Sequence, residues 1–162
     1  MLVPALLYKT DLEEKFASQI YEDRYFYYMG NAFCYELPNI KPDSFAPCKQ
    51  YAILTDDEDE RLIGYLAYTI DPYASAVYNF GLYSFEEGNV RVIRDTFTEL
   101  EKLTKQFHRI EWRCVGGNHA LNGYRAFCKK HNGTEFHLHD TLKDKWGNFV
   151  DSYIFEIINP EK

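Results

Sequence analysis

Residues 76–106 read AVYNFGLYSF-EEGN-VRVIRDTFTELEKLTKQ, and this stretch decides the fold. Its first part, residues 76–85, is rich in aromatic and β-branched side chains, which predicts a β-strand. The EEGN that follows at residues 86–89 predicts a break, because Gly and Asn favour turns. From Val90 to Gln106 apolar side chains recur three or four residues apart, so an amphipathic helix is expected. The stretch is therefore a strand, a short loop and a helix.

The chain after this stretch alternates between the same two kinds of element. Arg109 to Val115 reads RIEWRCV and predicts a strand, which Gly116-Gly117-Asn118 ends. A helix is expected from His119 to His131, and two strands from Glu135 to Leu142 and from Val150 to Ile158. The last strand becomes continuously apolar, which favours a buried central position.

The N-terminal part predicts a helix from Asp11 to about Tyr28. Thr10 and Glu13 have the spacing of a capping box at its start. Leu12, Phe16 and Ile20 follow four residues apart and form one apolar face.

A β-hairpin is expected next. After a proline-containing loop at residues 38–47, the strands run from Gln50 to Thr55 and from Arg61 to Ile70. The acidic run Asp56–Glu60 between them is interpreted as a solvated turn, because its charge density opposes burial.

These elements predict an α+β domain, with helices on both faces of a mixed, mostly antiparallel sheet. A chain of 162 residues is long enough for one core, and we expect a single domain over residues 1–162. The formal net charge of −7 argues against nucleic acid as a partner, because binding phosphates requires a basic face.

Membrane association is not expected either. No apolar run approaches the roughly 20 residues of a membrane helix. The N-terminal residues MLVPALLYKT have no basic region followed by a long apolar one, so we expect no signal peptide. With four cysteines and no CxxC motif, the chain is expected to be cytoplasmic, with reduced thiols.

From Gln50 to Ile158 the order of elements resembles the GNAT superfamily of acyl-CoA N-acyltransferases. The residues that carry the resemblance are Ile63-Gly64-Tyr65, the strand–loop–helix from Gly81 to Arg94, Asn118 with Tyr124, and the turn 143–147, KDKWG. That turn looks like the D-x-x-G hairpin of bacterial-type acetyltransferases that act on ribosomal proteins. The resemblance implies the GNAT fold and acetyl-CoA as cosubstrate.

The resemblance also implies a set of cofactor-binding residues. The strand Leu82, Tyr83 and Ser84 would pair with the pantetheine arm. The loop and first helical turn, Gly88, Asn89, Val90 and Arg91, would hold the pyrophosphate on backbone N–H groups and the helix dipole. The family loop reads Gln/Arg-x-x-Gly-x-Gly/Ala, and only Gly88 matches it, so this cofactor loop is degenerate.

Two carboxylates, Glu86 and Glu87, lie in that loop, where they would repel a pyrophosphate. Arg91 and Arg94, in the first turns of the following helix, would add positive charge there. A GNAT-fold module that has lost its cosubstrate therefore stays open beside the enzyme.

The catalytic role that the resemblance implies falls on Tyr124, whose hydroxyl would protonate the departing thiolate. Asn118 would approach the cofactor. Tyr124 follows Asn118 by six residues, one fewer than in the family, so core packing is its alternative role. For Asn118 the alternative is a helix N-cap.

No general base is assigned. Glu111, Asp71 and a water held by a backbone carbonyl are the candidates. Glu111 and Arg113 share a strand face, which favours an ion pair between them. His137 and His139 have a zinc-ligand spacing, but without a third ligand nearby we interpret them as a surface pair and expect no metal. Cys114 and Cys128 are expected to pack as small hydrophobic residues.

The function that follows is transfer of an acetyl group from acetyl-CoA to a primary amine of a small molecule or protein. The first alternative is a non-catalytic GNAT-fold module with an aromatic pocket of Tyr25, Phe26, Tyr65, Tyr68 and Tyr83 for another ligand or partner. The second is a partner-binding protein with no small-molecule site. The acceptor and the oligomeric state, a homodimer included, stay open.

Overall fold

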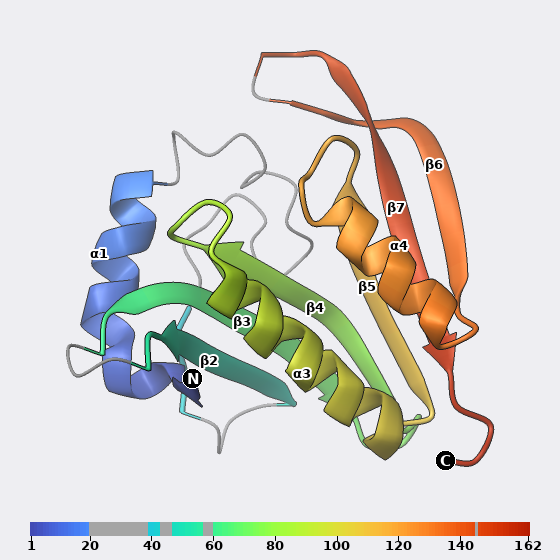
Figure 1. Cartoon of the computed structure of the whole chain (residues 1–162), viewed down its shortest axis with the longest axis horizontal. Coiled ribbons are helices and arrows are strands. Elements are labelled where there is room, and N and C mark those ends of the chain that lie inside the picture. The colour runs from blue at the N-terminus through green and yellow to red at the C-terminus, as the bar shows by residue number, and fades with distance from the viewer. Residues whose placement is uncertain (20–38, 43–46, 57–59, 145) are drawn as a thin grey trace.

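The computed structural model describes residues 1–19, 39–42, 47–56, 60–144 and 146–162. Its centre is a seven-stranded sheet in the order β1-β2-β3-β4-β5-β7-β6 (Figure 1). Every neighbouring pair is antiparallel except β4 and β5, which are parallel. The strands are β1 (Leu2–Pro4), β2 (Cys48–Leu54), β3 (Leu62–Asp71), β4 (Ala76–Ser84), β5 (Arg109–Val115), β6 (Thr134–Lys143) and β7 (Phe149–Ile158).

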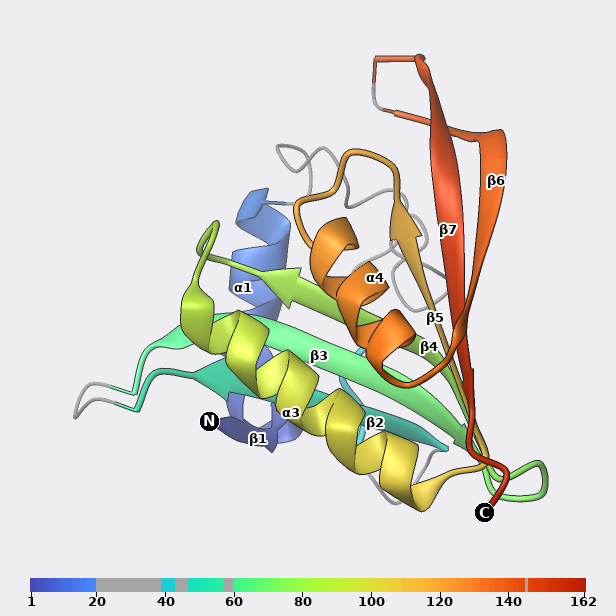
Figure 2. The ribbon, with the colours of Figure 1, turned by 45° about the vertical axis from the view of Figure 1, so that its right-hand side comes forward.

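Helices cover both faces of this sheet. A short 3-10 turn (Ala5–Tyr8) leads into α1 (Lys9–Gln19) on one face, and α3 (Val90–Gln106) and α4 (Leu121–Lys130) lie side by side on the other (Figure 2). The predicted α+β class is therefore confirmed, as is the mixed, mostly antiparallel sheet between helices.

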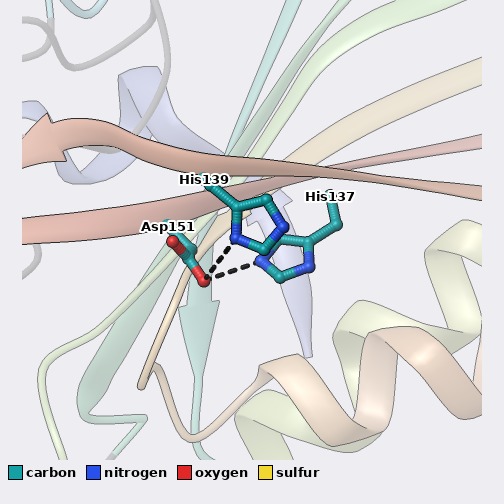
Figure 3. Close-up of side chains that lie close together, drawn as sticks. All are labelled: His137, His139 and Asp151. Atoms are coloured by element: carbon teal, nitrogen blue, oxygen red, sulfur yellow. Dashed lines mark hydrogen bonds and ion pairs between the residues drawn. The ribbon is translucent and has the colours of Figure 1, made fainter.

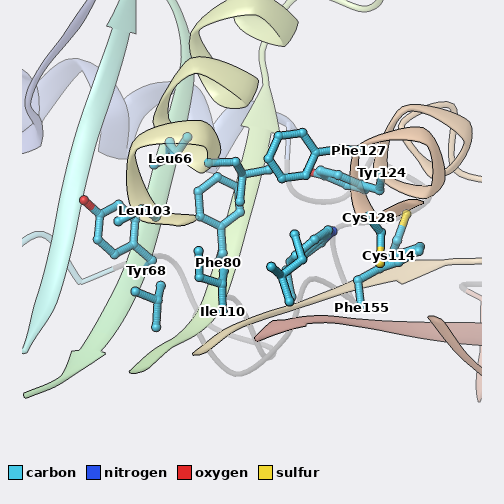
Figure 4. Packing of buried hydrophobic residues seen from close by; sticks show 14 of the residues in the cluster. Leu66, Tyr68, Phe80, Leu103, Ile110, Cys114, Tyr124, Phe127, Cys128 and Phe155 are labelled. Carbon is cyan, nitrogen blue, oxygen red and sulfur yellow. The ribbon is translucent and has the colours of Figure 1, made fainter. Parts of the chain in front are cut away.

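Two hydrophobic clusters fill the two faces. The larger lies under α3 and α4 and includes Leu66, Phe80 and Trp112 (Figure 4). The smaller lies under α1 and includes Tyr65 and Phe16. Because neighbouring residues of a strand point to opposite faces, Leu66 and Tyr65 serve one cluster each. β3 is buried on both faces, which explains its continuous apolar sequence.

At Gly64, β4 and α3 approach the backbone of β3 closely. A Cβ atom built there would lie 2.9 Å from the backbone oxygen of Tyr83 and 3.4 Å from the side chain of Val92. β4 and the first turn of α3 therefore sit as close to β3 as they do because residue 64 has no side chain.

The helix α3 and the strand β5 begin and end at the predicted residues, and the bounds of β2, β3, β4, α4, β6 and β7 lie within two residues of the predicted ones. The capping box is wrong, because the 3-10 turn continues directly into α1 and Thr10 lies inside the helix. Leu12 and Phe16 are buried as predicted, whereas the second half of the predicted helix, with Ile20, lies outside the described residues.

Two further differences concern the sheet. β1 was not predicted, because three residues carry too little periodicity, yet it pairs with β2 at the edge. β7 is buried between β5 and β6 but is next to the edge rather than central. Of the predicted acidic turn the structure describes only Asp56 and Glu60.

Candidate functional site

β4 and β5 form a wedge that is closed at one end and open at the other. At the closed end Ala76 pairs with Arg109 and Phe80 with Trp112. A bulge interrupts this ladder between Val77 and Phe80, where Asn79 adopts a left-handed φ of 54°. The extra residue bends β4 away from its neighbour. Beyond Phe80 and Trp112 the two strands separate.

Each strand keeps its other neighbour where the wedge opens. β4 stays paired with β3 as far as Ser84, and β5 stays paired with β7 as far as Val115. Across the open end, no ladder between β4 and β5 joins the backbone N–H and C=O groups along their facing edges. Such groups can accept a ligand that takes the place of a strand.

A cavity of about 870 Å³ fills the open end. It is lined on one side by residues 79–85 and on the other by residues 111–115. Gly88, Asn89, Asn118, His119 and Tyr124 also line it. The volume is in the range of roughly 300–1,000 Å³ that is typical of small-molecule sites.

Leu82, Tyr83 and Ser84 all line this cavity. The side chains of Leu82 and Tyr83 pack into the clusters on opposite faces of the sheet. The Ser84 hydroxyl donates a hydrogen bond to the carbonyl oxygen of Glu86. What these residues offer the cavity is therefore mainly their backbone.

The loop between β4 and α3 is shaped by Gly88 and Asn89. Gly88 has a φ of 70°, a conformation in which a side chain would be strained. Asn89 caps α3, because its side-chain oxygen accepts from the N–H groups of Arg91 and Val92 at 2.9 and 3.4 Å. Those two donors are already used by the chain itself.

The two loop carboxylates have different surroundings. Glu86 accepts from Arg61 at 3.1 Å and from the Asn89 amide at 2.8 Å, so its charge is engaged within the loop. Glu87 lines the cavity and pairs with His119, whose Nε2 lies 3.4 Å from its Oε1. Both side chains of this pair are exposed, and together they span the mouth of the wedge.

Val90, Arg91 and Arg94 do not line the cavity. Val90 is 78% exposed. Both guanidinium groups form ion pairs with Asp56, at 2.5 Å for Arg91 and 3.2 Å for Arg94. Asp56, at the start of the predicted turn, is therefore not merely solvated, and the positive charge expected beside the phosphates is directed to Asp56 instead.

Asn118 and Tyr124 reach the cavity from the segment after β5. The Asn118 side chain accepts from the N–H of Ala120 at 2.8 Å, so it caps the turn before α4 rather than the helix itself. Tyr124 is 6% exposed, and its ring packs against Trp112 and Phe97. Its burial raises the pKa of the phenol above the ordinary value, so the hydroxyl stays protonated and can donate.

The predicted ion pair between Glu111 and Arg113 is wrong. Glu111 pairs instead with Arg109 at 2.7 Å, and Arg109 also binds Glu156. Arg113 lines the cavity without an ion-pair partner among the residues that the structure describes. Sequence reasoning missed this cation, because strand alternation places Arg109, Glu111 and Arg113 on one face of β5 without showing which of the two arginines pairs with Glu111.

Cys114 lines the cavity but is buried. Burial raises the pKa of its thiol to about 12, so it is not a nucleophile at neutral pH. The proposed aromatic pocket is not formed as predicted, because Tyr68 lies in the cluster under α3 whereas Tyr65 and Tyr83 lie in the one under α1. Tyr25 and Phe26 are outside the described residues.

His137 and His139 are exposed on β6, as expected for a surface pair. The expectation that no third ligand lies nearby is wrong, because Asp151 of β7 approaches both rings.

Across the described segments, no helix has the length and apolar character needed to cross a bilayer.

Comparison with known proteins identifies this fold. No protein-family model matches the chain, and no curated protein does. Solved structures do match. A probable GNAT-family acetyltransferase from Chromobacterium violaceum has a TM-score of 0.59 at 18% identity, over 98% of this chain and 85% of that one. The Arabidopsis thaliana protein NAA60, in complex with a bisubstrate analogue, has a TM-score of 0.62 at 17% identity, over 94% and 95%.

A third structure is RimL, a ribosomal L7/L12 alpha-N-protein acetyltransferase in complex with coenzyme A. It has a TM-score of 0.50 at 18% identity, over 71% of this chain and 64% of that one. These likenesses show that the chain has the GNAT fold, as its sequence predicts.

Proposed function

We propose that this protein is an N-acyltransferase that transfers an acetyl group from acetyl-CoA to a primary amine of a small molecule or a protein. The observation that carries the proposal is the separation of β4 from β5 beyond Phe80 and Trp112, which leaves two strand edges facing a cavity of about 870 Å³. The GNAT fold supports it, as does the coenzyme A bound to RimL.

The strand edge and the mouth of the wedge differ in how well they fit acetyl-CoA. The strand edge at Leu82–Ser84 offers N–H and C=O groups at the spacing of a β-ladder, which matches the amides of a pantetheine arm. At the mouth, the N-terminus of α3 favours an anion, because the helix dipole is positive there. Glu87 opposes that preference, whereas Glu86 is engaged by Arg61 and Asn89.

The chemistry is a direct transfer. The neutral amine attacks the thioester carbonyl carbon, a C–N bond forms, and the C–S bond breaks. The amine nitrogen releases its proton to water, the departing thiolate takes a proton from an acid of the protein, and that acid recovers a proton from water, so the products are the amide and the free thiol of coenzyme A. Tyr124 is the proton donor in this proposal, because its buried phenol is protonated and its side chain lines the cavity.

The acceptor is an amine for a reason of charge. The protein carries a formal net charge of −7, which favours the approach of a cation over that of an anion. Glu111 is not assigned as the base that deprotonates the amine, because Arg109 holds its carboxylate at 2.7 Å.

Calorimetric titration with acetyl-CoA, at low and at moderate salt, tests the proposal. We expect a dissociation constant in the micromolar range, about −8 kcal/mol, and weaker binding of acetyl-pantetheine, which lacks the pyrophosphate. An amine panel with detection of the released thiol then tests transfer. Absence of binding at both salt concentrations, with no thiol release, would overturn the proposal and favour the non-catalytic module.

A further inference from the structure

A second cluster of reactive side chains lies outside the wedge, where β6 and β7 pair. His137 and His139 of β6 and Asp151 of β7 project from the same side of the two strands and meet at one point (Figure 3). Their ligand atoms all lie within 4.8 Å of one another. The two imidazoles stand close together, with ring centroids 3.9 Å apart.

An irregularity in β6 creates this arrangement. The register between β6 and β7 shifts between Leu138 and Leu142, and Asp140 adopts a left-handed φ of 51°. The Asp140 N–H leaves the ladder and donates to Oδ1 of Asp151 at 3.0 Å. The same bulge therefore breaks the strand pairing and fixes the carboxylate beside the histidines.

The carboxylate is held by one oxygen and presents the other. Oδ2 of Asp151 lies 2.6 Å from Nε2 of His137 and 3.8 Å from Nδ1 of His139. Because Oδ1 already accepts from the Asp140 N–H, Oδ2 is the carboxylate oxygen directed at the two imidazoles. The His137 ring is also supported, because it stacks on Tyr153 at 4.4 Å.

These distances are close to those of a metal site. Zinc bonds of about 2.0–2.2 Å in a tetrahedron place ligand atoms roughly 3.4 Å apart. The two measured separations from Oδ2 of Asp151 fall on either side of that value. Because His139 is 76% exposed, its ring is free to make the small rotation required. The exposed side of the cluster leaves the fourth position to water.

We propose that His137, His139 and Asp151 form a three-ligand site for a divalent transition-metal ion, with zinc as the best match. Two imidazoles and a carboxylate favour zinc over magnesium or calcium, which take oxygen ligands. The ion joins β6 to β7 where the bulge interrupts their hydrogen bonds. Its role is structural: it cross-links two strands at the edge of the sheet, away from the β4–β5 cavity.

One of the three proposed ligands, Asp151, also contacts the segment that follows β5. The carbonyl oxygen of Asp151 accepts from the N–H of Gly116 at 2.8 Å, at the end of β5. Holding Asp151 in place therefore stabilises three segments that are neighbours in the sheet: β6, β7 and the turn after β5. We expect zinc to raise the melting temperature of the protein for this reason.

The test is calorimetric titration of chelator-treated protein with zinc chloride. We expect one ion per chain. Cobalt(II), used as a second probe, should give the visible absorption of a four-coordinate ion. Loss of a group that only supports a metal ligand costs roughly 10–100-fold in affinity, so His137→Ala, His139→Ala and Asp151→Asn should each cost at least that. Magnesium should not bind.

A matched control separates this site from binding to any surface histidine. His119 is 84% exposed and lies outside the cluster, so His119→Ala should leave zinc affinity unchanged. The rise in melting temperature on adding zinc should disappear in His139→Ala, while the metal-free melting temperature stays close to that of the wild type because His139 is 76% exposed. Absence of zinc binding, or equal binding by the wild type and all three cluster variants, would overturn the proposal.

Discussion

The two ends of the β4–β5 wedge are built in different ways. At the closed end the strands are paired and side chains do the work, as in the stack of Trp112 on Phe155, with centroids 5.3 Å apart. Glu101 there binds Lys130 and His131, both at 3.0 Å, and links α3 to α4. At the open end the strands separate, and the exposed pair Glu87–His119 spans the gap at 3.4 Å. Side-chain packing therefore stabilises the closed end, whereas no ladder joins β4 to β5 at the open end.

The closed end should be the more sensitive to loss of a side chain. Phe155 is fully buried, so Phe155→Ala should lower the free energy of unfolding by about 3–5 kcal/mol through lost burial and a residual cavity. Phe149→Ala on the same strand is the control, because Phe149 is 62% exposed. Chemical denaturation measures both. Equal effects of the two variants would mean that burial of Phe155 is not what stabilises the closed end.

At the open end the largest effect should be on rate rather than on stability. Tyr124→Phe removes the proposed proton donor but keeps the ring that packs on Trp112. General acid catalysis contributes about 10²-fold or more, so kcat should fall by about that factor with little change in KM for acetyl-CoA. Thiol-release kinetics measure it. An unchanged kcat would leave Tyr124 as a core residue alone.

The mouth of the wedge should respond to charge. One unit charge about 10 Å from another in water contributes about 0.4 kcal/mol, so Glu87→Gln should tighten acetyl-CoA binding about fourfold against a pyrophosphate with two charges. Glu86→Gln is the contrasting variant, because Glu86 is bound to Arg61 and Asn89 and its loss disturbs the loop. Calorimetry at low salt should show the gain for Glu87→Gln only, and high salt should abolish it. A gain for both variants would show that Glu86 also repels the cosubstrate.

The smallest expected effect is a pH dependence at the closed end. Hydrogen bonds from Lys130 and His131 lower the pKa of Glu101 to about 2, below the ordinary value of 4.5. A depressed pKa stabilises the fold above pH 4.5, and this contribution is lost as the pH falls from 4.5 towards 2. Because Glu101 is near the surface, the contribution is about 0.5 kcal/mol. Denaturation at pH 6 and pH 3 should show a smaller loss in Glu101→Gln than in the wild type.

The closed end could be predicted from sequence because it depends on side chains. The apolar spacing of Val90 to Gln106 gave the bounds of α3, and the composition of RIEWRCV gave those of β5. The residues predicted for the open end were found through a family resemblance. Of these, Leu82 to Ser84, Gly88, Asn89, Asn118 and Tyr124 surround one cavity, whereas Val90 and Arg91 do not.

The parts that could not be predicted depend on distances between segments. Asp56, which follows β2, forms ion pairs with Arg91 and Arg94 of α3, and no local sequence pattern shows a contact between segments so far apart in the chain. Asp151 completes the histidine cluster from a neighbouring strand for the same reason. The bulge at Asn79 requires a left-handed residue, which Asn tolerates, but many Asn residues are not in bulges.

Where β4 and β5 separate, the facing edges of the two strands consist of peptide groups, which are the same in nearly every residue. Replacing a side chain along such an edge leaves its hydrogen-bonding groups in place, provided that the strand still folds. Sequence identity between proteins of one fold can therefore become low while a site of this kind is kept in the backbone. Identities of 17–18% with proteins of the same fold are what such a site permits.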